Sequence, residues 1–425
     1  MNRLLMIISI ACFVFPLSGQ NKDYAREQID TLASESMHGR GYVNNGVRVA
    51  ADYLVQELKD IGVFAWKGGY RQACAFPVNT FPGNMYLNAD GKTMKPGYDF
   101  QVKTWSEGLT DTLKVLRLEE KHLKDMEHMR KLRDQDLKDY LILLDPKRFS
   151  DKMAKNLNNI AYVNFFGAAG YVNLVDAEKL MWSVAGSHKM VEHIVIDVKR
   201  EAWNDATRII LDIESRFYNQ YETANVIGYL KGREEPDSFV LITAHYDHLG
   251  RMGENTCYCG AHDNASGTAL TLDLASYFAV SQNRPRHSLL FVFFSGEEAG
   301  LHGSRFFADN PPLNLDKVKF VVNLDIVGTG SKGIKVVNGA ILKKQFELLK
   351  SINEQEAYVT DVKKRGEAAN SDHYPLYAKG IPAFFVYTLG DEYKEYHNPD
   401  DVAKALPLTA YEGLFRLIRD YVEQL

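Results

Sequence analysis

Strand-like and helix-like patterns alternate through the second half of the chain. The apolar runs typical of strands are NVIGYL, FVLITA, SLLFVFF, FVVNL and IPAFFVY, and segments with helical spacing begin near Ser266, Gly300, Ile341, Asp372 and Leu408. Several runs are apolar at successive positions, as expected for strands that are covered on both faces. The pattern predicts an α/β fold in three layers, with a mixed, mostly parallel sheet between helices.

The first half has a different pattern of apolar and polar residues. Apolar residues recur at helical spacing over 23–36 and again over 47–61, where Gly62 ends the run. From about 67 to 220 the strand-like runs are short, and the charged stretch 117–139, with alternating signs, is predicted to be a solvated helix or polar connection. We therefore expect residues 21–66 and 221–425 to form one catalytic domain, into which a mostly β domain, residues 67–220, is inserted.

The first 20 residues have the pattern of a secretory signal peptide. One basic residue, Arg3, precedes an apolar stretch from Leu4 to Leu17 and then small or polar residues up to Gln20. The stretch is shorter than the about 20 residues of a membrane-spanning helix. The prediction is an exported protein, periplasmic or secreted, without stable membrane insertion; lipidation at Cys12 and an uncleaved anchor are the less favoured alternatives.

Composition excludes some partners. The 425 residues are 45% hydrophobic and 25% charged, with a net charge of −5, and this mild acidity argues against nucleic acid or an anionic membrane as the main partner. Removal of the signal would leave Cys74, Cys257 and Cys259. One disulfide is plausible in an exported protein, and the sequence leaves its pairing open, although a 257–259 bridge would close a small, strained ring. Metal binding by Cys257 or Cys259 is a less favoured interpretation.

Polar residues with metal-binding side chains follow the apolar runs. His245, Glu297, Glu298 and Asp325 stand at the ends of three strand-like runs, where ligands bind in open α/β sheets. Asp263 lies in the glycine-flanked loop GAHDNASG, and His397 lies in the polar loop EYHNPDD. Histidine nitrogens and carboxylate oxygens are zinc ligands, and one carboxylate can bridge two cations. The six residues together predict a site for two zinc ions with a general base, and hence metal-assisted hydrolysis.

Each of these residues has a plainer explanation when it is taken alone. His245 with Asp247 could be structural, the Asp263 loop could be a helix start capped by Asn264 or Ser266, and a single His397 could be merely exposed. The prediction rests on the set and on its position at the strand ends.

The motifs AHYDHLG, GAHDNASG, FSGEEAGLHGS, NLDIVG, SDHYPLYAKGIPAFF and YHNPDD closely resemble the zinc peptidase family that includes bacterial leucyl aminopeptidases and glutamate carboxypeptidase. The resemblance is strong over 222–425 and loose over 23–66, and it implies a phosphorylase/hydrolase-like fold. The insert resembles a degenerate protease-associated domain much more weakly, best at GAAGYVNLVDAEK.

The resemblance also implies a role for each residue. His245 and Asp325 would bind one zinc ion, Glu298 and His397 the other, and Asp263 would bridge them. Glu297 would be the general base, Asp247 the partner of His245, and Tyr396 a donor to the developing oxyanion. His262, where many relatives have an acidic or small residue, is a departure for which we expect a structural role.

The implied activity is hydrolysis of N-terminal residues from peptide substrates. A carboxypeptidase or dipeptidase with the same site, a glutaminyl cyclase and a non-catalytic peptide-binding homologue are the alternatives. The full ligand set favours hydrolysis, and the preference for an aminopeptidase rests on analogy. The sequence leaves side-chain specificity and oligomeric state open.

Overall fold

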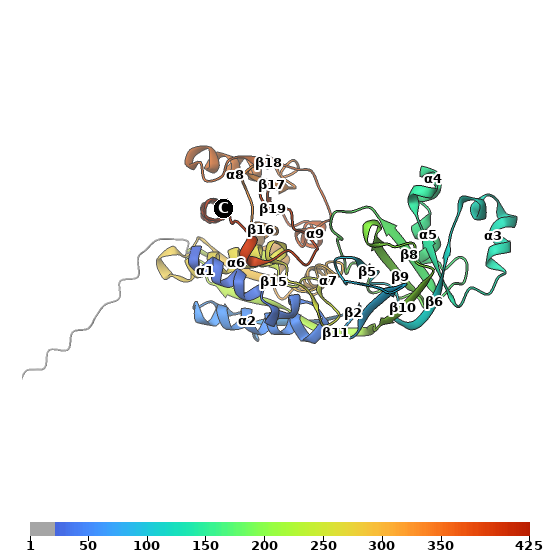
Figure 1. The fold of residues 1–425 in the computed structure, drawn as a ribbon. Coiled ribbons are helices and arrows are strands. Elements are labelled where there is room, and N and C mark those ends of the chain that lie inside the picture. Colours follow the sequence, from blue (N-terminus) through green and yellow to red (C-terminus); the bar gives the residue numbers. More distant parts are fainter. Residues whose placement is uncertain (1–21) are drawn as a thin grey trace, which may run out of the picture.

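The computed structural model describes residues 22–425, so the predicted signal peptide, with Arg3 and Cys12, lies outside the described residues. Two sheets dominate the fold (Figure 1). Over residues 22–425, no helix combines the length and apolar character needed to cross a bilayer.

The larger sheet has nine strands. Its order is β1 (Phe64–Ala65), β11 (Arg216–Leu230), β15 (His287–Phe294), β12 (Glu235–His245), β16 (Val318–Leu324), β19 (Ala383–Thr388), β17 (Ile334–Val337) and β18 (Val362–Lys364), with β2 (Arg71–Thr80) paired to β11. Strands β15, β12, β16 and β19 are mutually parallel, whereas β11 and β17 run antiparallel to their neighbours in this group. The carboxyl ends of the four parallel strands therefore meet at one edge of the sheet.

Helices cover both faces of this sheet. The core on one face includes residues of α1 (Lys22–Leu32), α2 (Gly46–Asp60), α6 (Ser266–Ala279), α8 (Lys343–Glu356) and α10 (Tyr411–Gln424). The core on the other face includes α7 (His302–Asp309) and α9 (His373–Ala378). Along β15, Phe291 and Phe293 enter the first core and Val292 and Phe294 the second. Burial on both faces explains why this strand reads as a continuous apolar run.

The predicted helix starts in the second half lie within three residues of the observed ones. The helix predicted over 23–36 is shorter, because α1 ends at Leu32 and a 3₁₀ turn, η1 (Glu35–Arg40), follows. His38, Gly39 and Arg40 have φ values of 49°, 61° and 47°, which a right-handed helix cannot contain.

The second sheet has eight strands and lies to one side of the first (Figure 1). Its order is β4 (Lys92–Met94), β3 (Met85–Ala89), β10 (Arg208–Ile213), β6 (Leu109–Arg117), β7 (Tyr140–Leu144), β8 (Gly170–Val175), β9 (Ile194–Lys199) and β5 (Phe100–Val102). The short helices of this region are α3 (Met126–Arg133), which lies in the charged stretch, α4 (Asp151–Ala154) and α5 (Leu157–Tyr162). The long paired strands β2 and β11 carry the chain out to this sheet and back.

Candidate metal centre

Three neighbouring strands deliver four of the predicted residues to one edge of the larger sheet. His245 is the last residue of β12, Asp325 directly follows β16, and Glu297 and Glu298 follow β15 after a turn at Gly296. The φ of Gly296 is +73°, a value that favours glycine. The rigid strand ends therefore fix where these side chains begin.

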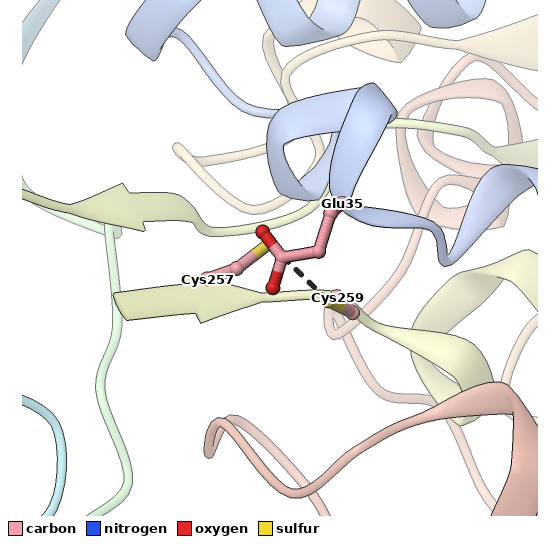
Figure 2. Close-up of side chains that lie close together, drawn as sticks. All are labelled: Glu35, Cys257 and Cys259. Carbon is pink, nitrogen blue, oxygen red and sulfur yellow. Dashed lines mark hydrogen bonds between the residues drawn. The ribbon is translucent and has the colours of Figure 1, made fainter. Parts of the chain in front are cut away.

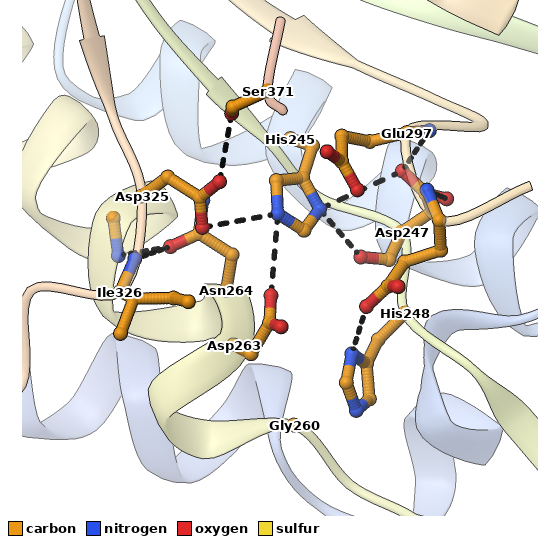
Figure 3. Close-up of polar contacts among 12 residues, drawn as sticks. His245, Asp247, His248, Gly260, Asp263, Asn264, Glu297, Asp325, Ile326 and Ser371 are labelled. Carbon is orange, nitrogen blue, oxygen red and sulfur yellow. Dashed lines mark hydrogen bonds and ion pairs between the residues drawn. The ribbon is translucent and has the colours of Figure 1, made fainter. Parts of the chain in front are cut away.

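Asp263 lies between two imidazoles. Its Oδ1 is 3.2 Å from Nε2 of His245, and its Oδ2 is 3.1 Å from Nε2 of His397. Figure 3 shows one ring nitrogen of His245 facing the carboxylates of both Asp263 and Asp325. Asp263 comes from the loop between β14 (Thr256–Tyr258) and α6, and His397 comes from the loop after β19. Each oxygen of the Asp263 carboxylate thus faces a different imidazole nitrogen.

A second carboxylate accompanies each imidazole. Asp325 Oδ1 is 3.3 Å from His245 Nε2, and Ser371 Oγ donates to the other oxygen of Asp325 at 2.7 Å. Glu298 Oε2 is 3.1 Å from His397 Nε2. All five predicted ligands therefore converge, as two His–carboxylate pairs on either side of Asp263.

The buried charges of Glu298 and His397 shift each other's pKa strongly. Glu298 and Asp263 are 6% and 3% exposed. Burial would raise the pKa of Glu298, but the His397 charge lowers it to about 2. Burial would likewise lower the pKa of His397, and Glu298 and Asp263 raise it to about 11. Buried carboxylates this close together require positive charge. Histidine nitrogens and carboxylate oxygens suit Zn²⁺, so the donor set fits a divalent metal.

Asp247 supports the site differently from the expectation. The short contact to His245 Nδ1 comes from the Asp247 carbonyl oxygen at 3.1 Å, while the carboxylate Oδ1 lies 3.8 Å away. That carboxylate accepts hydrogen bonds from the backbone N–H of Glu297 at 3.1 Å and of Glu298 at 3.4 Å, and from the Tyr42 hydroxyl at 3.0 Å. Asp247 therefore orients the turn that carries both glutamates, in addition to orienting the imidazole.

Glu297 and Tyr396 flank the ligands. The Glu297 carboxylate lies with His245 and Asp325 in a group whose ligand atoms are all within 4.8 Å of one another. Burial, and then repulsion from Glu298, raises the pKa of Glu297 well above its ordinary value, against the effect of His245. Tyr396 is 40% exposed, and its ring stacks on that of His397 with centroids 3.9 Å apart. Both side chains are placed beside the donor set.

The sequence did not single out His248, which is fully buried beside the site. Its Nδ1 lies 2.7 Å from Oε1 of Glu298, whereas His397 contacts the other oxygen, Oε2. Its ring packs so closely on Gly260 that a Cβ at this glycine would lie 2.4 Å from His248 Cδ2. The sequence HYDH could have indicated a role for His248, because this residue follows the same strand end as His245.

Arg40 is a second unpredicted residue, and it joins the two ligand loops. Its fully buried guanidinium donates to the carbonyl oxygens of Tyr246 at 2.8 Å, of Cys259 at 2.7 Å and of Gly260 at 2.7 Å, and to that of Leu32 at 2.7 Å. One side chain thus holds the loop after His245 to the loop before Asp263. No local sequence signal reveals this, because the partners in the two loops are backbone atoms 206 to 220 residues away.

His262 has structural contacts, as expected. Its Nδ1 accepts a hydrogen bond from the Gly328 amide at 3.2 Å, and its own amide donates to Asp401 Oδ1 at 2.9 Å. The amide of Asp263 donates to Asp401 Oδ2 at 3.2 Å. A buried carboxylate from the loop after His397 therefore holds the loop that carries Asp263.

Comparison with known proteins agrees with this geometry. Residues 225–422 match the profile of Peptidase family M28, and all the predicted site residues lie inside this span. Residues 225–422 are an M28 peptidase domain. This match confirms the family resemblance stated from the sequence.

The chain has curated relatives among fungal proteins. It is 38% identical over 127 residues to a probable zinc metalloprotease of Pyricularia oryzae and 35% identical over 127 residues to one of Leptosphaeria maculans. These matches cover 29% and 28% of this chain and 25% and 28% of the relatives, so this chain spans about a quarter of their length.

Solved structures match almost the whole chain. BSAP, a zinc aminopeptidase from Bacillus subtilis, is 20% identical, with a TM-score of 0.69 over 95% of this chain and 94% of that chain. An aminopeptidase from Aneurinibacillus sp. strain AM-1 is 19% identical, with a TM-score of 0.65 over 96% and 94%. At such identities the likeness establishes the fold, and it confirms the predicted α/β class.

The Arg40 contacts give a testable prediction about stability. Arg40→Met removes a donor from four buried carbonyl oxygens, of which that of Gly260 keeps a hydrogen bond from the Ala265 amide at 3.1 Å. The loss costs about 1–3 kcal/mol for each of the other three groups. We expect the free energy of unfolding, measured by urea denaturation with a chelator present, to fall by at least about 3 kcal/mol. Arg48→Met, at an exposed position of α2, is the control. Equal stability of the two variants would refute the role given to Arg40.

Proposed function

We propose that the protein is a zinc-dependent aminopeptidase with two zinc ions in the M28 site. The observation that carries this proposal is the placement of Asp263, whose two oxygens face His245 and His397 at 3.2 and 3.1 Å. A carboxylate in this position can serve two cations at once. The names of the similar proteins, zinc metalloprotease and zinc aminopeptidase, support the metal and the reaction class.

Five residues would hold the metal ions. His245 and Asp325 would bind one ion, Glu298 and His397 the other, and Asp263 both. Bound zinc would lower the pKa of a water molecule and polarise the carbonyl of the scissile peptide bond.

Glu297 is the proton carrier in this proposal. Its carboxylate is partly exposed beside the ligands, and Asp247 holds its backbone amide. As a general base it accepts a proton from the attacking water, and it then donates this proton to the departing amine. Tyr396, whose pKa burial and the nearby carboxylates raise, keeps its hydroxyl proton at neutral pH and can donate a hydrogen bond to the developing oxyanion.

Glu297→Gln tests the assignment of the base. The amide has nearly the same shape but cannot accept the proton, so we expect kcat to fall by about 10²–10⁴-fold while bound zinc is unchanged. The assay is hydrolysis of a panel of aminoacyl substrates with free and with blocked N-termini. Cleavage of free N-termini alone is expected of an aminopeptidase, and equal cleavage of blocked substrates would contradict that part of the proposal.

The matched control is Glu347→Gln, at an exposed position of α8. It should leave both kcat and zinc content unchanged. A Glu297→Gln enzyme that turns over as fast as this control would show that another group moves the proton.

The ligand assignment has its own test. His397→Ala and Glu298→Ala each remove a donor from the same His–carboxylate pair, so each should bind one zinc equivalent less than the wild type after dialysis. Zinc is counted by atomic emission, and His128→Ala, an exposed histidine of the insert, is the control. Zinc contents equal to that of the wild type in both variants would refute the second metal position.

The connection between β8 and β9 of the second sheet contributes a support for this pair. We propose that the second sheet belongs to an inserted domain, close to the predicted residues 67–220. Lys179 Nζ lies 2.7 Å from Glu395 Oε2 and 2.7 Å from Asp400 Oδ2, on either side of His397. The backbone N–H of Trp182 donates to the carbonyl oxygen of His397 at 2.9 Å. The φ of His397 is +53°, a conformation that non-glycine residues adopt only when their surroundings hold them. The insert therefore positions a metal ligand.

Lys179→Ala should loosen the His397 loop. We expect the affinity for the more weakly held zinc, measured by competition with a chromophoric chelator, to fall by about tenfold, the usual effect of losing a group that orients a ligand. Lys179→Arg should restore it, because a guanidinium can reach both carboxylates. Lys147→Ala, which removes an ion pair to Asp176 elsewhere in the insert, is the control. Unchanged zinc affinity in Lys179→Ala would refute the proposal that Lys179 positions His397.

A further inference from the structure

A cluster of potential metal-binding side chains lies outside the M28 site. Cys257 on β14 and Cys259 just after it are two residues apart on one side of the strand, with their sulfur atoms 3.2 Å apart. Glu35, at the start of η1, brings its carboxylate to the same place, and the three ligand atoms all lie within 4.8 Å of one another. Figure 2 shows the Glu35 carboxylate in front of the two sulfurs. All three cysteines of residues 22–425 are free thiols, so the sequence-based expectation of a disulfide is not met.

We propose that Cys257, Cys259 and Glu35 form a binding site for a soft divalent cation such as Zn²⁺ or Cd²⁺, separate from the proposed peptidase centre. Thiolate sulfur prefers soft cations, and two thiolates with a carboxylate and one water would complete four-coordination. Binding replaces two S–H bonds by two metal–sulfur bonds and releases two protons to solvent, with no change in oxidation state.

The backbone around the cluster is already ordered. Gly39 of η1 packs so tightly on the hairpin of β13 (Gly250–Met252) and β14 that a Cβ there would lie 2.3 Å from the Tyr258 carbonyl oxygen. Arg40, the next residue, is bonded to the carbonyl oxygen of Cys259 at 2.7 Å. The segments that carry the ligands are thus held together by contacts that do not use the ligands themselves, which lowers the entropic cost of binding a cation.

Access and charge also suit a cation. Both thiols are 6% exposed, whereas the side chain of Glu35 is 75% exposed, so the carboxylate is on the solvent side of the sulfurs. Arg251 Nη1 is bonded to Glu35 Oε2 at 2.9 Å, which orients the carboxylate and leaves its Oε1 for a ligand bond.

The site would act on the peptidase centre through Arg40. A cation shared by Glu35 and the two cysteines would fasten η1 to the segment that leads through Gly260 to Asp263. Arg40 on η1 already holds Cys259 and Gly260. The bound cation would therefore stabilise the loop that carries the bridging carboxylate without contributing a ligand to it.

Titration of the reduced, full-length zinc-loaded protein with Cd²⁺ tests the proposal, because the sulfur-to-cadmium charge-transfer absorption reports thiolate ligation alone and no M28 ligand is a thiol. The wild type and Cys74→Ser, which removes the third, distant cysteine, should both develop the band with one equivalent of Cd²⁺. Cys257→Ser/Cys259→Ser should lack the band and bind one equivalent less. Glu35→Gln, at an exposed position, should develop it with at least about tenfold weaker affinity.

Three results would overturn the proposal. The first is a reduced wild type that shows no band, and the second is a double variant that shows the same band as the wild type. The third is a Cys257–Cys259 disulfide, found by thiol counting and mass spectrometry, in protein isolated after export. None of these measurements depends on peptide hydrolysis. A failure of the proposed peptidase activity is therefore distinguishable from a failure of the proposed thiolate site.

Discussion

Buried negative charge is the constraint on which this structure depends. The edge of the larger sheet gathers Asp263, Glu298 and Asp325, each almost inaccessible to solvent, with Glu297 beside them. Carboxylates this close cannot all be ionised in a poorly solvated place unless positive charge is near. The chain supplies three imidazoles: those of His245 and His397 lie 3.1–3.3 Å from the carboxylates, and that of His248 lies 2.7 Å from Glu298. Divalent cations would supply the positive charge that is still lacking. Because holding the carboxylates together costs free energy without a metal, relief of this repulsion would make metal binding tight.

The supports around the ligands follow from the same constraint. Ligands on parallel strand ends are fixed by the sheet, but Asp263 and His397 come from loops and must be held by other means. Asp401 accepts the amides of the Asp263 loop, and Arg40 ties that loop to the end of β12. Lys179 and Trp182, in the connection between β8 and β9, hold the His397 loop. Each loop that carries a ligand is thus held by residues distant from it in the sequence.

Sequence patterns predicted the α/β class and the larger elements, because β15 and its neighbours are buried on both faces and their apolar runs have few alternatives. Three of the predicted ligands and the predicted base, Glu297, were predictable from their position after such runs, and the structure brings all five of the predicted ligands together. Arg40, Asp401 and Lys179 were not predictable, since each acts on backbone or side-chain atoms far away in the sequence. The carboxylate of Asp247 was expected to contact His245, yet its shorter contacts are hydrogen bonds from backbone amides and from the Tyr42 hydroxyl. The spacing of residues in the sequence cannot determine which of these partners the carboxylate binds.

Anomalous diffraction at the zinc edge, from crystals of the zinc-loaded protein, tests the central claim most directly. The account predicts two zinc peaks in the M28 site, one on each side of the Asp263 carboxylate and about 3.5–4 Å apart. One of them should contact His245 and Asp325, and the other Glu298 and His397. A single peak at this site, or two peaks of which only one contacts Asp263, would contradict the account.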